Sequence, residues 1–167
     1  FNGTPMKSLA REICQNSIDA SLKNGQPTRI EFVPFEINPN DIPDFINLKD
    51  AFKRSLDFWS LQKSSKAKKF FENAISTAEA SKIMCLRISD FNTTGLTGST
   101  DEYNSAWSNL TKSTGASDKS GTNGGSFGIG KFAPYSCSNF RTVFYSTADE
   151  TGVCAYQGVS RLSLIHI

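Results

Sequence analysis

Three polar side chains near the start of the chain have the types and spacing needed to hold a metal ion and activate water. Glu12, Asn16 and Asp19 lie within residues 6–23, and intervals of four and three place them on one stripe of a helix. An amide oxygen is a hard ligand suited to Mg²⁺, and a carboxylate one turn away can act as a general base. The alternative is that this stripe is the solvated surface of an ordinary amphipathic helix.

Two later segments carry groups that suit an amine and an anion. Asp90 follows an apolar run, and its carboxylate can accept a hydrogen bond from an exocyclic amine. Gly125, Gly128 and Gly130 let the backbone approach phosphate oxygens, and a helix beginning at Lys131 would add free N–H groups. The alternative for these glycines is a tight turn. Their spacing matches neither the P-loop nor the dinucleotide fingerprint.

The first stripe needs a helix to position it, and residues 6–23 predict one. Thr4 and Pro5 form a plausible start, and Asn24-Gly25 forms a left-handed stop. The apolar positions fall on the side opposite the polar stripe. They are Ala10, Ile13, Cys14 and Ile18.

The remaining elements alternate between strands and helices. Alternation and β-branched residues predict strands at 28–37, 140–146 and 153–159, with Pro34 at a sheet edge. The apolar run 82–89 predicts a buried strand. Helical periodicity covers 48–61 and 65–80, and the lysines at 63–69 form either a solvated helix face or a nucleic-acid patch. Residues 93–124, rich in Ser, Thr, Gly and Asn, predict a mobile lid with a short helix at 101–110.

Composition indicates a folded, cytoplasmic protein. The 167 residues suffice for one domain, and the net charge of +2 is spread among interspersed charges, which gives no chain-wide attraction to nucleic acid or membrane. No apolar run is long enough to span a bilayer. The four cysteines have no metal-ligand spacing. Both ends look cut, so we expect a fragment, with residues 162–167 a candidate for sequence not native to the fold.

The three motifs, in order and spacing, resemble those of the GHKL or Bergerat-fold ATPases. REICQNSIDA at 11–20 is similar to the N box, DFNTTGL at 90–96 to the first glycine box, and GSFGIGK at 125–131 to the second. The chain departs from the family at Asn92, which replaces a glycine, at Gly95, which falls one residue late, and in a helical insertion at 41–80. Hsp90 and MORC-type members, and uncharacterised bacterial ATP-binding proteins suspected of anti-phage defence, are the most similar.

This resemblance implies an α+β fold, a two-layer α/β sandwich whose mixed sheet carries helices on one face, spanning 1–167 as one domain. It implies that Glu12 is the general base, that Asn16 ligates Mg²⁺ and that Asp90 binds the adenine amino group. The residues it implies for binding the rest of ATP are Asp19, Asn92, Gly95, Gly125, Phe127, Gly128, Ile129, Gly130 and Lys131.

The function expected from this resemblance is binding and hydrolysis of Mg·ATP to drive a conformational change in a larger protein. Its partners would be ATP, a second copy on nucleotide binding and a downstream effector domain, with nucleic acid reached only through missing domains. One alternative is a nucleotide-gated dimerisation module with negligible turnover. Another is a structural protein without a ligand, in which the stripe is solvated and the glycines form turns.

Overall fold

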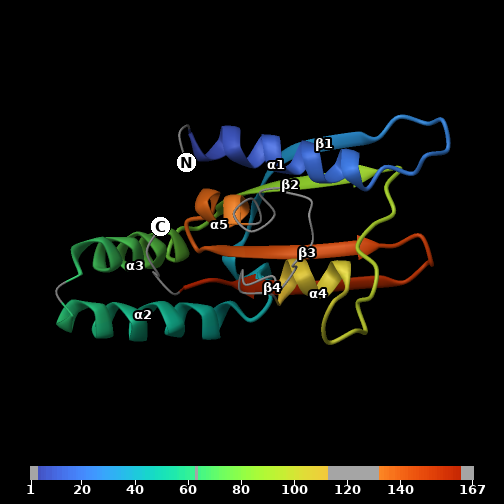
Figure 1. Ribbon diagram of the computed structural model, residues 1–167. Coiled ribbons are helices and arrows are strands. Elements are labelled where there is room, and N and C mark those ends of the chain that lie inside the picture. Colours follow the sequence, from blue (N-terminus) through green and yellow to red (C-terminus); the bar gives the residue numbers. More distant parts are fainter. Residues whose placement is uncertain (1–3, 63, 113–131, 163–167) are drawn as a thin grey trace. The chain divides into compact units, whose positions relative to one another are not determined.

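Two compact units make up the chain in the computed structural model, which describes residues 4–62, 64–112 and 132–162. The first unit comprises Phe1–Ile30 and Asp90–Arg161, and the second comprises Glu31–Ser89 and Leu162–Ile167. Strands β1 (Arg29–Ile37) and β2 (Ile83–Phe91) pair with each other, and each contains a boundary between the units (Figure 1).

The α+β class is confirmed, but the predicted mixed sheet is wrong for the described residues. They form two separate two-stranded sheets, β1–β2 and β3–β4. Strands β3 (Thr142–Ala148) and β4 (Cys154–Ser160) are antiparallel neighbours in the chain, joined by a short turn that brings them together before any longer-range pairing is needed. The two-layer sandwich stays a prediction.

Helix α1 (Pro5–Asp19) carries the first polar stripe, but it ends earlier than predicted. The backbone after it hydrogen-bonds across to a distant segment, because Leu22 N donates to Asn92 O at 3.1 Å and Thr94 N donates to Ala20 O at 2.9 Å. These bonds replace further helical bonds. Gly25, with φ +82°, therefore forms a later turn and does not terminate the helix.

The buried face of α1 also differs from the prediction. Leu9 and Ser17 are buried, whereas Ala10 is exposed and Ile18 is 61% exposed. The helix packs against α5 (Ala133–Cys137), which in turn contacts β3. Because the small Ser17 side chain allows close approach, the inward face is centred between Leu9 and Ser17, and the most apolar side chains lie elsewhere.

The second unit contains the helical pair predicted at 41–80. Helices α2 (Phe45–Leu61) and α3 (Ser65–Ala78) lie side by side, preceded by the short 3₁₀ helix Pro39–Asp41 (Figure 1). Phe52 and Phe71 are fully buried, with ring centroids 6.5 Å apart. On α3 the lysine side chains are exposed, and Lys68 lies 3.8 Å from Glu72. Exposure fits both a solvated face and a nucleic-acid patch, so the choice between them stays a prediction.

Strand β2 is not the buried strand that its apolar run predicted. Ile83 is its only buried residue, and Met84 is 66% exposed. An apolar run favours a strand, but it does not determine whether other elements pack on that strand and bury it. Among the described residues, β2 pairs with β1 alone. Asp90 lies inside this strand and not after it.

The first part of the predicted lid is packed into the first unit. Helix α4 (Ala106–Thr111) begins with a capping box between Ser105 and Ser108, and Trp107 is 3% exposed. Burial of the indole anchors the described part of this segment. Residues 113–124 of the predicted lid lie outside the described residues. Among the helices that the structure describes, none has the length and apolar character to cross a membrane.

Candidate functional site

The polar stripe on α1 is only partly accessible. Glu12 is half-buried, whereas Asn16 and Asp19 are exposed. Asp19 Oδ1 accepts a hydrogen bond from Gln15 Nε2 at 2.8 Å. Within the described residues, the side chains of Glu12 and Asn16 form no hydrogen bond or ion pair. Their oxygens are therefore available to a ligand, a metal ion or water.

The segment that contains Asp90 and Asn92 is attached to the chain that follows α1. Ser21 and Thr93 form an isolated antiparallel bridge, flanked by the two backbone hydrogen bonds described above. Asn92 has φ +62°, a left-handed conformation that asparagine tolerates better than most residues. Its side chain hydrogen-bonds to Asn24 and to the backbone of Gln26. The fold thus brings the first two predicted motifs together.

Asn92 therefore has a different environment from the one its motif implied. Its amide is engaged with protein atoms, and Asp90 is exposed with no side-chain partner in the described part of the chain. We infer that Asn92 organises the segment, while Asp90 keeps its carboxylate free. The glycine expected at position 92 and this asparagine share the ability to adopt a positive φ.

Gly95 packs against the turn between β3 and β4. At φ +68°, a Cβ on Gly95 would lie 2.9 Å from each of Ala148 O, Asp149 Cα and Thr147 Oγ1. Leu96 N donates to Thr147 Oγ1 at 2.9 Å, and Glu150 N donates to Thr94 O at 3.0 Å. Only a residue without a side chain permits this approach.

Asp149 holds the turn against which Gly95 packs. Its Oδ1 accepts hydrogen bonds from Thr151 Oγ1 at 2.6 Å, Thr151 N at 2.9 Å and Val153 N at 3.0 Å. The hydrogen bond from the Thr151 hydroxyl, assisted by the backbone donors, lowers the pKa of Asp149 below its usual value near 3.8. The sequence predicted the two flanking strands but not the role of this carboxylate.

We expect Asp149 to make the folding stability fall at acidic pH. Because its folded pKa is lowered, the ionised carboxylate stabilises the fold above its unfolded pKa, and this contribution disappears as the pH falls through the folded pKa. Asp149→Asn should melt below the parent at neutral pH, and the gap should close as the pH falls below about 4, the ordinary pKa of an aspartate. Thermal melts across this range measure it. Glu150→Gln, one residue away and exposed, should follow the parent, and a gap that persists in acid would contradict the prediction.

The third motif, Gly125, Phe127, Gly128, Ile129, Gly130 and Lys131, lies outside the described residues. Phe132, the next residue, belongs to the first unit, and α5 directly after it packs against α1. The helix predicted after Lys131 is thus present, but it has only five residues, so it adds few aligned peptide dipoles. Two motifs and the residue following the third therefore belong to one unit.

Tyr135 in α5 and Tyr145 in β3 form a hydrogen-bonded pair that the sequence did not predict. Tyr135 is buried, and the Tyr145 hydroxyl donates to the Tyr135 hydroxyl at 3.3 Å. Burial, with this hydrogen bond, raises the pKa of Tyr145 well above its usual range. The Arg161 guanidinium lies 5.2 Å from the ring centroids of Phe132 and Tyr135. These contacts tie α5 and β3 to the end of β4.

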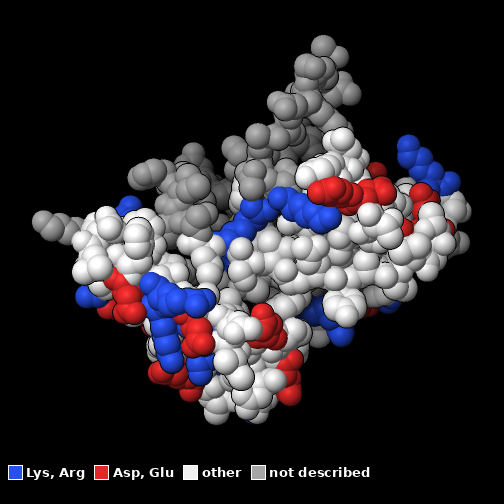
Figure 2. All heavy atoms as spheres, turned by 90° about the horizontal axis from the view of Figure 1, so that it is seen from below, with Lys and Arg blue, Asp and Glu red and all other residues white. Residues whose placement is uncertain are grey.

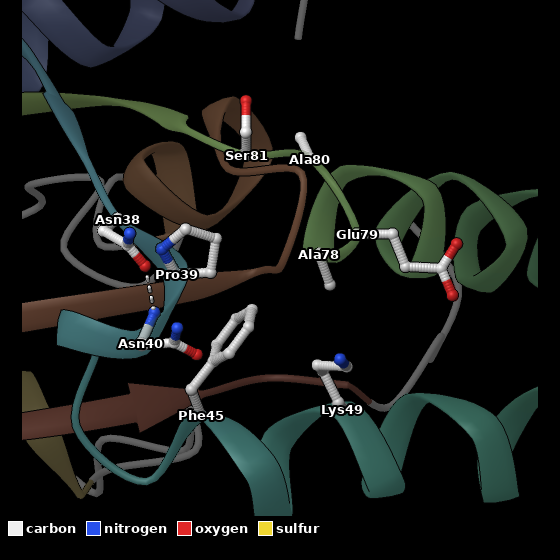
Figure 3. A pocket seen from close by; sticks show the side chains of 9 residues that line it. All are labelled: Asn38, Pro39, Asn40, Phe45, Lys49, Ala78, Glu79, Ala80 and Ser81. Atoms are coloured by element: carbon white, nitrogen blue, oxygen red, sulfur yellow. Dashed lines mark hydrogen bonds between the residues drawn. The ribbon is translucent and has the colours of Figure 1, made fainter.

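A surface cavity lies in the second unit, away from these motifs in the sequence. It measures about 450 Å³ and lies at the start of α2 and the end of α3 (Figure 3). The Phe45 ring points into it, and Asn38 Oδ1 accepts from Asn40 N at 2.9 Å (Figure 3). No predicted site residue lines it. Most polar residues that line the cavity are exposed to solvent, and none of them is buried.

Charge offers no second site on the surface shown. Figure 2 shows basic and acidic side chains interspersed on that face, which fits the small net charge. The described residues contain no cluster of three or more His, Cys, Asp or Glu able to hold a metal ion.

Comparison of the chain with models of protein families, with functionally described proteins and with solved structures gives no match. The resemblance of the three motifs to the GHKL ATPases stays a prediction.

Proposed function

We propose that the chain binds Mg·ATP through the first unit and hydrolyses it to drive a conformational change in a larger protein. The observation that carries this proposal is the attachment of the Asp90–Asn92 segment to the chain after α1, through Leu22, Thr94 and Ala20. The two motifs, at 11–20 and 90–96 in the sequence, were chosen for complementary chemistry and belong to one unit. The attachment supports a shared site, because Ala20 of the first motif and Thr94 of the second are joined by a backbone hydrogen bond.

The α1 residues fit a magnesium ion that is shared with a nucleotide. Asn16 presents an exposed amide oxygen without a protein partner in the described chain, and Mg²⁺ is usually held by one or two protein ligands with phosphates and water. Asn16 would hold the ion, which neutralises phosphate charge when bound.

The two carboxylates and the glycine motif have the remaining roles in this proposal. Half-buried Glu12, unpaired within the described residues, can take a proton from water. Asp90 can accept a hydrogen bond from the adenine amino group. The backbone of Gly125, Gly128 and Gly130 would hold the phosphates. Dimerisation on nucleotide binding and an effector domain belong to the same proposal.

Asn16→Ala tests the metal ligand. If the Asn16 amide holds Mg²⁺, the substitution should weaken ATP binding strongly in Mg²⁺ and hardly at all in EDTA, because only the metal-dependent part of the affinity is lost. Titration calorimetry in both buffers measures the two dissociation constants. Lys7→Ala, an exposed change on the same helix, serves as the control. Equal losses in both buffers would remove Asn16 from the metal site, and no binding by the parent would end the proposal.

A further inference from the structure

The side chains of Asn24 and Asn92 form a reciprocal pair. Asn24 Nδ2 donates to Asn92 Oδ1 at 2.9 Å, and Asn92 Nδ2 approaches Asn24 Oδ1 at 3.3 Å. Asn92 Nδ2 also donates to Gln26 O at 2.7 Å. The pair therefore connects the turn after α1 with the segment after β2. We call it the asparagine clamp.

The backbone around the clamp determines the orientation of both amides. Gln26 N donates to Asn24 Oδ1 at 3.0 Å, so an oxygen must occupy that position. Gln26 O accepts from residue 92, so an N–H must occupy the matching position there. Only asparagine supplies the donor and the acceptor at this length. Aspartate at position 92 would direct a carboxylate oxygen at the Gln26 carbonyl.

Position 92 also needs a positive φ, which places two demands on one residue. Glycine would satisfy the backbone but form no clamp, and most other residues would be strained at φ +62°. Asn104 has nearly the same φ, +61°, in the same unit, and the described residues show no side-chain hydrogen bond for it. Asn104 thus shares the backbone requirement of Asn92 without its contacts.

We propose that Asn92 is a positioning residue, which with Asn24 holds the Asp90 segment at a fixed place relative to α1. This inference rests on the proposed function, because Asp90 and the α1 residues must act on the same nucleotide. The clamp would set the distance between the group that recognises the base and the groups that act at the phosphates. The contact of Asn92 with nucleotide implied by the family resemblance is replaced by this indirect role.

Amide hydrogen exchange tests the clamp without any nucleotide. The amides of Leu22 and Thr94 donate across the junction, so their protection reports how firmly the two segments are attached. Asn92→Gly keeps the positive φ and Asn92→Asp keeps the shape, and both should lower this protection about tenfold or more. Asn104→Gly should leave it unchanged. Unchanged protection in both Asn92 variants would overturn the proposal.

Thermal melts then test whether Asn24 and Asn92 act as one unit. Asn24→Ala should remove the same contact as Asn92→Gly, so the double variant should melt close to the less stable single variant. Losses that simply add would show that the two side chains are energetically independent, and would overturn the clamp.

Nucleotide affinity separates positioning from simple stability. Well below the melting temperature, Asn92→Gly should raise the dissociation constant for Mg·ATP roughly tenfold. Ala74→Gly, a destabilising change within α3, should not raise it. If the parent binds Mg·ATP and the Asn92 variants bind it equally well, the positioning role of Asn92 is rejected while the proposed function stands. If the parent does not bind, the proposed function fails and the positioning role fails with it, whatever the exchange data show about the clamp.

Discussion

Glu12→Ala should bind Mg·ATP about as well as the parent while its turnover falls by about 10²–10⁴-fold, the usual contribution of a general base. Glu12 is half-buried and its side chain has no polar partner among the described residues, so its loss removes no hydrogen bond or ion pair there. A general base acts on water only as the reaction proceeds, and ground-state affinity should therefore stay constant. Phosphate release and equilibrium binding measure the two effects.

Asp90→Asn is the matched comparison, because Asp90 would act on the base in the ground state. Losing a charge-assisted hydrogen bond, worth about 1.5–3 kcal/mol, should weaken nucleotide binding roughly tenfold or more. The two carboxylates should thus affect different constants. Parental turnover in the Glu12 variant would remove its catalytic role. A parent that binds ATP without measurable turnover would instead favour a nucleotide-gated dimerisation module.

Local patterns predicted most elements because their signals lie within one segment. The facing aromatic residues of α2 and α3, and the alternation in β3 and β4, identified these elements to within a few residues. The end of α1 was not predictable in this way. Its last turn competes with hydrogen bonds to Asn92 and Thr94, and these partners are about 70 residues away in the chain.

Residue types in the candidate site were easier to predict than their surroundings. Carboxylate, amide and glycine positions could be chosen from their chemistry, but exposure and partners depend on tertiary contacts. Asn92 was expected at the nucleotide, yet its amide is engaged by Asn24 and Gln26. Asp90 was expected at the end of a buried strand, yet it is exposed within β2. Spacing along the chain contains no information about these contacts.

Gly95→Ala should destabilise the fold by about 2–5 kcal/mol, the sum of a positive-φ penalty and overpacking against the β3–β4 turn. The added Cβ would lie 2.9 Å from Ala148 O and from Asp149 Cα, which are backbone atoms and cannot rotate away. To relieve the contact, the segment must leave the turn and give up the bond between Leu96 N and Thr147 Oγ1. The melting temperature should fall on the order of 10 °C.

Gly152→Ala isolates the steric part of this effect. Gly152 has φ +85°, close to the φ +68° of Gly95, but a Cβ there would meet no atom within 4 Å. This variant should lose only the backbone penalty, about 1–2 kcal/mol. The difference between the two losses then measures how tightly the first glycine motif packs on the hairpin. Equal losses would contradict that packing, and Gly95 would then be explained by its backbone conformation alone.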